Sequence, residues 1–314
     1  MRALILAGGL SFEREVSLRS GRRVCDALRS AGVEAEVRDA DATLLATLAE
    51  TSPDAVFVAL HGAPGEDGAI RGVLDLAGVP YVGAAPHACR LAWDKPIAKG
   101  LLRSAGVATP DAVTLPHSTF RELGAHAVLE RLLARLPLPL LVKPASGGSA
   151  LGASIVRDAD ALPAAMVHCF SYGDTALVER LVTGTELAVS VVERDGTPEA
   201  LPAVEVVPRE GPLFDYNARY TAGATDYHAP ARLPEPVLTA AARAALAAHR
   251  VLGLRDLSRT DLVVDEDGTP WFLEVNVSPG MTETSLLPMA AAAAGVDVGG
   301  LCRDLVAAAA ARQA

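Results

Sequence analysis

A strand expected over residues 271–277 carries two side chains that suit a divalent cation. Glu274 and Asn276 alternate with apolar residues and lie roughly 6–7 Å apart on one face. Because the alternation is strict, one face is expected to hold Trp271, Leu273, Val275 and Val277, and the other Phe272, Glu274 and Asn276. Carboxylate and amide oxygens are ligands that hard cations such as Mg²⁺ prefer. The spacing therefore indicates a surface suited to a metal ion.

The preceding segment, residues 257–265, is expected to pair with this strand as a hairpin. Asp-Gly at 267–268 is a strong signal for a two-residue loop between β-runs. Counting back from such a loop gives two facing pairs, Asp261 with Glu274 and Arg259 with Asn276. Neighbouring carboxylates repel unless a cation lies between them, which favours a metal–phosphate site. The alternative is an exposed hairpin face that carries ordinary charges.

Polar residues follow the strand and lead into an alanine-rich helix. Ser278-Pro279-Gly280 ends the strand, and hydroxyl side chains at 282, 284 and 285 come before Leu286. A helix start rich in Ser and Thr offers backbone N–H groups and the positive end of the helix dipole to an anion. An anion site this close to metal ligands favours the metal–phosphate interpretation over a surface hairpin.

The length and composition of the chain are those of an ordinary globular protein of two or three domains. Of 314 residues, half are hydrophobic and 21% are charged, and the net charge is −10. That charge argues against a general binder of nucleic acids or anionic membranes, which needs a basic face. No apolar run approaches the ~20 residues of a membrane span, and no signal peptide is expected. Four scattered cysteines without a CxxC pair indicate reduced thiols in a cytosolic protein: Cys25, Cys89, Cys169 and Cys302.

The first third of the chain alternates strands and helices, with strands expected at 2–7, 33–38 and 55–60. This pattern predicts a parallel, doubly wound sheet whose ligands lie at the carboxyl ends of the strands. The first loop there lacks GxGxxG, which disfavours a dinucleotide. Glu13 in that loop suits either an ammonium group or the start of the next helix. His61 in the third loop suits either a base or a hydrogen-bonded loop histidine.

Two further segments suit a nucleotide. Lys143 ends an apparent strand and is followed by a Gly/Ser loop over 145–152, whose backbone N–H groups could cradle phosphate oxygens. It is not a Walker A loop, because the lysine precedes the glycines, and an ordinary β-hairpin loop is the alternative. Residues 208–230 are expected to be irregular, and irregular segments longer than ~12–15 residues are typically lids or binding loops.

Taken together, these landmarks resemble the D-alanine–D-alanine ligases of the ATP-grasp superfamily. The resemblance covers essentially the whole chain, in order and spacing, through the segments GGLSFEREVS, LHGAPGEDG, WDK, VKPASGGSALG, VERLVTGTELAV, FDYNARY, SRTDL and EVNVSPGMTETSLLP. It implies an α/β ATP-grasp fold in three parts. These are an N-terminal Rossmann-like domain (1–90), a central ATP-grasp subdomain (91–182) and a C-terminal ATP-grasp domain (183–314) with a lid at about 208–230.

The resemblance also implies roles for matched positions. Those that contact the phosphates, adenine and ribose of ATP are Lys95, Lys143, Glu179, Arg180, Val182 and Glu186. Those that bind two Mg²⁺ ions, or Mn²⁺ in their place, are Asp261, Glu274 and Asn276. Those that bind the two amino acids, close the lid and stabilise the oxyanion are Glu13, His61, Ser149, Tyr220, Arg259, the backbone of Gly280, Ser285 and Leu286.

The implied reaction joins two D-alanine molecules through an acyl phosphate, in the cytoplasm, for peptidoglycan synthesis. A homodimer is implied by the family alone. A ligase of the same chemistry with another acceptor, such as D-lactate, D-serine or another amino acid, is the alternative; Tyr220 resembles dipeptide-forming members more than ester-forming ones. Three positions depart from the usual pattern: Ala150 replaces a second serine, Arg219 replaces a lysine and Val277 replaces a threonine. The first two bear on nucleotide affinity and lid closure more than on the reaction class.

Overall fold

The computed structural model describes residues 1–209, 218–219, 221 and 223–312. Its first sheet is parallel throughout, with strand order β2-β1-β3-β4. The strands are β1 (Arg2–Ala7), β2 (Glu34–Asp39), β3 (Ala55–Val58) and β4 (Tyr81–Val82), and the helices between them are α1 (Arg14–Ser30), α2 (Leu44–Thr51) and α3 (Ala69–Ala77). The predicted parallel, doubly wound sheet is confirmed.

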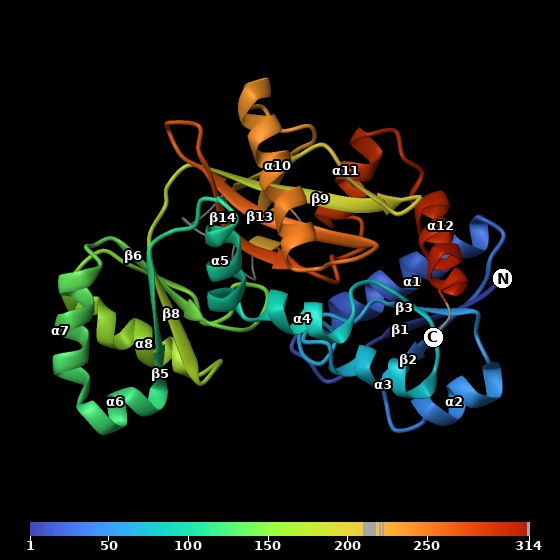
Figure 1. The fold of residues 1–314 in the computed structure, drawn as a ribbon, viewed down its shortest axis with the longest axis horizontal. Coiled ribbons are helices and arrows are strands. Elements are labelled where there is room, and N and C mark those ends of the chain that lie inside the picture. The colour runs from blue at the N-terminus through green and yellow to red at the C-terminus, as the bar shows by residue number, and fades with distance from the viewer. Residues whose placement is uncertain (210–217, 220, 222, 313–314) are drawn as a thin grey trace.

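Both faces of this sheet are covered, because successive residues of β1 point to opposite sides. Ala3 and Ile5 pack in one cluster with α1 and with the last helix, α12 (Val298–Ala311). Leu4 and Leu6 pack in another cluster with α2 and α3. The C-terminal helix therefore completes the core of the N-terminal sheet, and Figure 1 shows it beside α1.

A second sheet lies at the far end of the molecule from α12, at the left of Figure 1. Its strand order is β5-β8-β6-β7, antiparallel throughout, which encloses a separate apolar cluster. The strands are β5 (Ala112–Pro116), β6 (Leu140–Pro144), β7 (Ser154–Val156) and β8 (Thr175–Arg180); the helices are α6 (His117–Leu123), α7 (Ala125–Arg135), η1 (Ala159–Ala161, a 3₁₀ turn) and α8 (Leu162–Phe170).

The third sheet lies between the other two and is antiparallel, with order β12-β11-β9-β13-β14 and β10 beside β9. Its strands are β9 (Thr185–Arg194), β10 (Thr197–Ala200), β11 (Val204–Pro208), β12 (Thr225–His228), β13 (Leu257–Val264) and β14 (Pro270–Asn276), and its helices are α10 (Glu235–Val251) and α11 (Leu286–Ala293). The irregular segment predicted over 208–230 is shorter than expected, because β12 pairs with β11 within it.

Two helices cross between the predicted domains. α4 (Pro86–Trp93) and α5 (Lys95–Ser104) pack against β14, and Ala98 and Leu102 share an apolar cluster with Phe272. The predicted domain limits stay predictions, since the packing of α5 and α12 runs across them. No single helix among the described residues is long and apolar enough to cross a membrane; only α11 and α12 together, bent by 108°, reach that length and composition.

The β13–β14 hairpin pairs as predicted at the end away from its turn, but the turn itself is different. Arg259 faces Asn276 and Asp261 faces Glu274. The prediction of a two-residue loop is wrong. The Asp265 N–H donates to the carbonyl of Thr269, so the loop has three residues and the register next to it is shifted by one. A β-bulge opposite Asp261/Leu262 restores the register.

The bulge also overturns the expected strict alternation of β14. Phe272 is fully buried in the same cluster as Val275 and Val277, on the side away from Glu274. Leu273 instead lines the same cavity as its neighbour Glu274. An extra residue in a strand reverses the facing of everything beyond it, which explains the change.

Candidate active site

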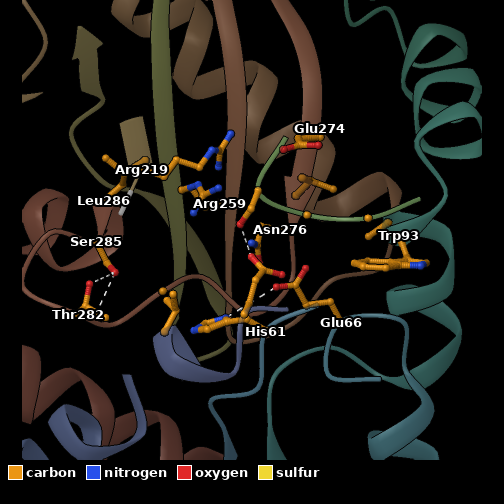
Figure 2. A pocket seen from close by; sticks show the side chains of 18 of the residues that line it. His61, Glu66, Trp93, Arg219, Arg259, Glu274, Asn276, Thr282, Ser285 and Leu286 are labelled. Atoms are coloured by element: carbon orange, nitrogen blue, oxygen red, sulfur yellow. Dashed lines mark hydrogen bonds and ion pairs between the residues drawn. The ribbon is translucent and has the colours of Figure 1, made fainter. Parts of the chain in front are cut away.

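Arg259, Glu274 and Asn276 point into one cavity, which β13 and β14 form with loops from the other two sheets (Figure 2). Asp261 and Glu274 line the adjoining cavity, so both carboxylates lie on the same side of the sheet. Among the described residues no cluster of three His, Cys, Asp or Glu side chains could hold a metal; this set instead combines two carboxylates with an amide. Its oxygen donors fit a hard divalent cation.

Cations surround the two carboxylates. Arg259 holds Asp261 through two hydrogen bonds, of 2.7 Å from Nε and 2.8 Å from Nη2. Lys95 lies 3.4 Å from Glu274 and donates to the carbonyl of Gly147 at 2.6 Å. Although burial opposes ionisation, the Lys95, Lys143, Arg219 and Arg259 charges lower the pKa of Glu274 to about 2. Glu274 is therefore ionised at any physiological pH.

The adjoining cavity has an apolar wall and charged ends. Its apolar residues come from both antiparallel sheets and include Leu141, Leu187, Val206, Leu262 and Leu273. Lys143 and Glu186 line the same cavity beside the Gly147–Gly148 backbone. A flat aromatic base with phosphates at one end and hydroxyls at the other matches this division.

The Gly/Ser loop over 145–152 joins β6 to β7, so it is a hairpin loop, and it also lines both cavities. Ser149 and Ala150 both have positive φ, 52° and 54°, which turns the loop back over the site. Ser149 Oγ donates a short hydrogen bond to Glu13. A Cβ on Gly148 would lie 3.0 Å from the same carboxylate, so glycine permits the close approach.

Glu13 precedes α1 but makes no side-chain cap to it. It is 7% exposed, and its carboxylate faces the cavity and the loop of the second sheet rather than its own helix. Of the two interpretations left open by the sequence, this placement favours a ligand for an ammonium group. The acid lies where a cationic substrate group would find a buried partner.

His61 has a hydrogen-bond partner at each ring nitrogen. Nδ1 lies 3.0 Å from the carbonyl of Ser278, and Nε2 lies 3.0 Å from the hydroxyl of Ser20. With Nδ1–H donating to the carbonyl, Nε2 accepts from Ser20, which in turn accepts from the Met281 N–H at 3.1 Å. The imidazole thus ties α1 to the loop after β14, which favours a positioning role over a base.

The segment after β14 approaches the cavity closely. Ser285 occupies the N-cap position of α11, but its hydroxyl turns back to accept from the Thr282 N–H at 2.9 Å. A Cβ on Gly280 would lie 2.6 Å from that hydroxyl, which explains a glycine here. Gly280, Ser285 and Leu286 all line the cavity, as shown for the last two in Figure 2.

Comparison with known proteins identifies the family. The model described as D-ala D-ala ligase C-terminus matches residues 101–307, and the model described as D-ala D-ala ligase N-terminus matches residues 33–84. The chain belongs to the D-alanine–D-alanine ligase family. A D-alanine–D-alanine ligase from Anaeromyxobacter dehalogenans is 42% identical over 97% of this chain and 96% of its own length.

Solved structures of the family share the fold. The VanG D-Ala:D-Ser ligase from Enterococcus faecalis superposes with a TM-score of 0.83 at 27% identity, over 98% of each chain. The D-alanine–D-alanine ligase from Bacillus anthracis complexed with ATP superposes with a TM-score of 0.79 at 30% identity, over 99% of this chain and 97% of that one. The predicted ATP-grasp fold is therefore confirmed.

Within this ligase fold, most positions predicted for the site line one of the two cavities, and a few do not. Glu179 lines neither cavity, because its side chain is buried between Lys99 and Lys143. Arg180 and Val182 line a separate groove with the turn at 265–267, where the Arg180 guanidinium stacks on Trp271 at 4.8 Å. Tyr220 lies outside the described residues. Arg219, which departs from the family pattern, lines both cavities.

Three residues of the ligase site carried no role in the sequence-based prediction. Glu66 lines the cavity 3.8 Å from His61, and Trp93 forms part of the same wall. Both belong to segments that carry the family resemblance, GEDG and WDK, which was the available signal. Lys99, just beyond WDK, is the third; it lines neither cavity but contacts Glu179, which Lys143 of the adjoining cavity also contacts.

Proposed function

We propose that this chain joins two D-alanine molecules to D-alanyl-D-alanine with consumption of ATP. The observation that carries the proposal is the convergence of family motifs on two adjoining cavities: Glu13, Arg259 and Glu274 line one, and Asp261 and Glu274 line the other. Curated relatives named D-alanine–D-alanine ligase are 38–42% identical over nearly the whole chain, and they support D-alanine as both substrates.

In the first step a carboxylate oxygen of D-alanine attacks the γ-phosphorus of ATP. A new O–P bond forms, the bond from the γ-phosphorus to the bridging oxygen breaks, and ADP leaves. Glu13 would hold the ammonium of this D-alanine, and Lys95 and Lys143 would hold phosphate oxygens. These groups are fixed before the reaction, so they act mainly by orientation and by electrostatic stabilisation.

In the second step the amine of another D-alanine attacks the acyl carbon. The carbonyl electrons move onto oxygen, and inorganic phosphate leaves when the carbonyl reforms. Arg259 and the Gly280 N–H would stabilise this oxyanion, while Ser285 and the start of α11 would hold the acceptor carboxylate. The acceptor amine must lose protons during the step, and the buried cavity limits hydrolysis of the acyl phosphate.

We also propose Mg²⁺ as the bound metal, with Mn²⁺ as a substitute. Asp261, Glu274 and Asn276 would hold two ions, since their oxygens match the preference of hard cations. When bound, the metal neutralises negative charge on the ATP phosphates. Arg259 would then be shared between Asp261 and the reacting oxygens.

The purified protein tests this function directly. With ATP, Mg²⁺ and D-alanine it should release D-alanyl-D-alanine, ADP and phosphate in equal amounts. Parallel reactions with D-lactate and D-serine test the alternative that the chain uses another acceptor. D-serine is included because the fold resembles that of a D-Ala:D-Ser ligase. Folded protein that releases no dipeptide at saturating D-alanine would refute the proposal, and preferential ester or D-Ala-D-Ser formation would support the alternative.

Two further features follow from the family resemblance. We propose that the enzyme works in the cytoplasm in peptidoglycan synthesis and that it forms a homodimer. Light scattering after size-exclusion chromatography should give twice the mass of the 32.4 kDa chain. A single-chain mass at micromolar concentration would contradict the dimer without affecting the proposed chemistry.

A further inference from the structure

Lysine is almost absent from this chain. Of its 28 basic residues only three are lysines, Lys95, Lys99 and Lys143, and the other 25 are arginines. All three lysines lie together at the nucleotide cavity: Lys95 and Lys143 line it, and Lys99 lies directly behind Glu179. Wherever either cation would serve, the chain carries arginine, so the third lysine marks a position that needs a compact ammonium.

The surroundings of Lys99 show what that ammonium does. Its side chain is 3% exposed, and Nζ lies 2.8 Å from Oε1 of Glu179 while donating to the carbonyl of Phe272 at 2.9 Å. Lys143 takes the other oxygen of the same carboxylate, Oε2, at 2.9 Å. One fully buried carboxylate therefore lies between two ammonium groups, one that lines the nucleotide cavity and one that does not.

The charges of this cluster do not cancel. Lys99 and Lys143 contribute two positive charges and Glu179 one negative charge, which leaves one net positive charge beside the cavity. Without Lys99, Glu179 would neutralise Lys143 completely and could bind it through both oxygens. The two lysines hold the pKa of Glu179 below its ordinary value, although burial opposes this, so the carboxylate stays charged.

We propose that Lys99 is a positioning residue for nucleotide binding: it holds Glu179 from behind and thereby keeps the Lys143 ammonium available to the ATP phosphates. The inference rests on the ATP site of the proposed function, but not on the identity of the amino acids. Lys99 also joins three elements at this point, since it lies on α5 and contacts β8 and β14. It therefore fixes Glu179 relative to both sheets that enclose the nucleotide cavity.

Calorimetric binding of Mg²⁺ and the non-hydrolysable analogue AMP-PNP to the full chain tests the proposal without any turnover. Lys99→Met keeps the length of the side chain and removes its charge, and it should weaken binding about tenfold or more. The matched control is Arg103→Met, one turn further along α5. It removes a cation that also makes two hydrogen bonds, to Thr109 and Pro110, outside the cavity. It should leave binding within about twofold of wild type.

The double variant Lys99→Met/Glu179→Gln separates positioning from structural damage. Removing both charges leaves Lys143 unneutralised and restores one net positive charge to the cluster. The double variant is compared with Glu179→Gln alone, which cancels any contact that Glu179 itself makes with the nucleotide. Because Lys99 acts through the Glu179 charge, Lys99→Met should weaken binding much less in the Glu179→Gln background than in wild type. An equal loss in both backgrounds, or unchanged binding in Lys99→Met, would overturn the proposal. Failure of all variants to make dipeptide would instead concern the proposed reaction.

Lysine-selective isotope labelling gives a second readout, because the folded chain has only three lysine side-chain signals. Without nucleotide, Lys99→Met should shift the Lys143 signal, and Arg103→Met should not. Should Lys99→Met fail to fold, titration of wild type replaces it. Deprotonation of Lys99, which faces Glu179, Lys143 and Glu274 and has its pKa lowered by burial to about 8, must move the Lys143 signal with the same midpoint. A Lys143 signal that ignores Lys99 would refute the coupling.

Discussion

Replacing Glu274 by glutamine should destabilise the metal-free protein as well as inactivate it. Active-site acids often lie near other acids, so that their removal stabilises a fold. Glu274 instead lies near four basic side chains, Lys95, Lys143, Arg219 and Arg259, whose positive charges stabilise its carboxylate. A neutral glutamine cannot balance these charges, so the basic side chains would repel one another.

The size of the effect follows from the pKa of Glu274. Each pKa unit corresponds to about 1.4 kcal/mol, so the fall from 4.5 to about 2 corresponds to about 3 kcal/mol of favourable interaction in the folded state. Because the side chain is 23% exposed, solvent screening reduces this to about 2–3 kcal/mol. The folded pKa is depressed, so the stabilisation is present above pH 4.5 and is lost as pH falls toward 2.

Urea denaturation in EDTA at pH 7 measures this directly. Glu274→Gln should lower the free energy of unfolding by about 2–3 kcal/mol, while the exposed Glu122→Gln on α6 should change it by less than about 0.5 kcal/mol. Turnover of Glu274→Gln should fall at least about 10²-fold. A variant as stable as wild type would show that the cations around Glu274 are neutralised by other groups, and full activity would mean that the metal site is misplaced.

Three other perturbations test separate parts of the structure. Arg259→Ala should lower kcat by about 10²–10³ with little change in AMP-PNP affinity; an equal loss in both would indicate a ground-state role. Asp256→Ala should lower the free energy of unfolding by about 3 kcal/mol in urea, since it leaves Gly83 N–H and Arg312 without their buried acceptor; an unchanged value would refute this. The kcat/KM for ATP should fall as pH rises through about 8, where Lys99 loses its proton, and Lys99→Met should remove this dependence.

The hairpin shows both the reach and the limit of prediction from sequence. The facing pairs Asp261–Glu274 and Arg259–Asn276 were predicted correctly, yet the turn that led to them was not. The real turn shifts the register by one residue and the bulge shifts it back, so two local deviations cancel at the site. Asp-Gly signals a turn without fixing its length, and nothing in the alternation of β14 signals an extra residue.

Residues that contact the cavity from loops were predictable through motifs, whereas residues that support them were not. Glu13, Ser149 and Ser285 stand in polar segments next to strand ends, where a parallel or packed sheet places ligands. The contact between Glu13 and Ser149 spans 136 positions along the chain, and no local sequence pattern contains such a separation. Lys99 has the appearance of a basic residue on an amphipathic helix, and only tertiary packing buries it.

The scarcity of lysine in this chain could have indicated that Lys99 is important, which no local pattern around it does. A chain with net charge −10 must gather positive charge locally to bind a polyphosphate, because its overall field repels one. Lys95 and Lys99 are four residues apart and so share one face of α5, where they reach Glu274 and Glu179 respectively. Each acid is thereby held by a lysine from the same helix, and the helix ties the β13–β14 hairpin, with its proposed metal ligands, to β8. Movement of α5 would disturb both acids together, so Pro96→Gly, which loosens the first turn of that helix, should weaken Mg²⁺ and AMP-PNP binding in parallel. Loss of only one of the two in calorimetry would show that α5 does not link them.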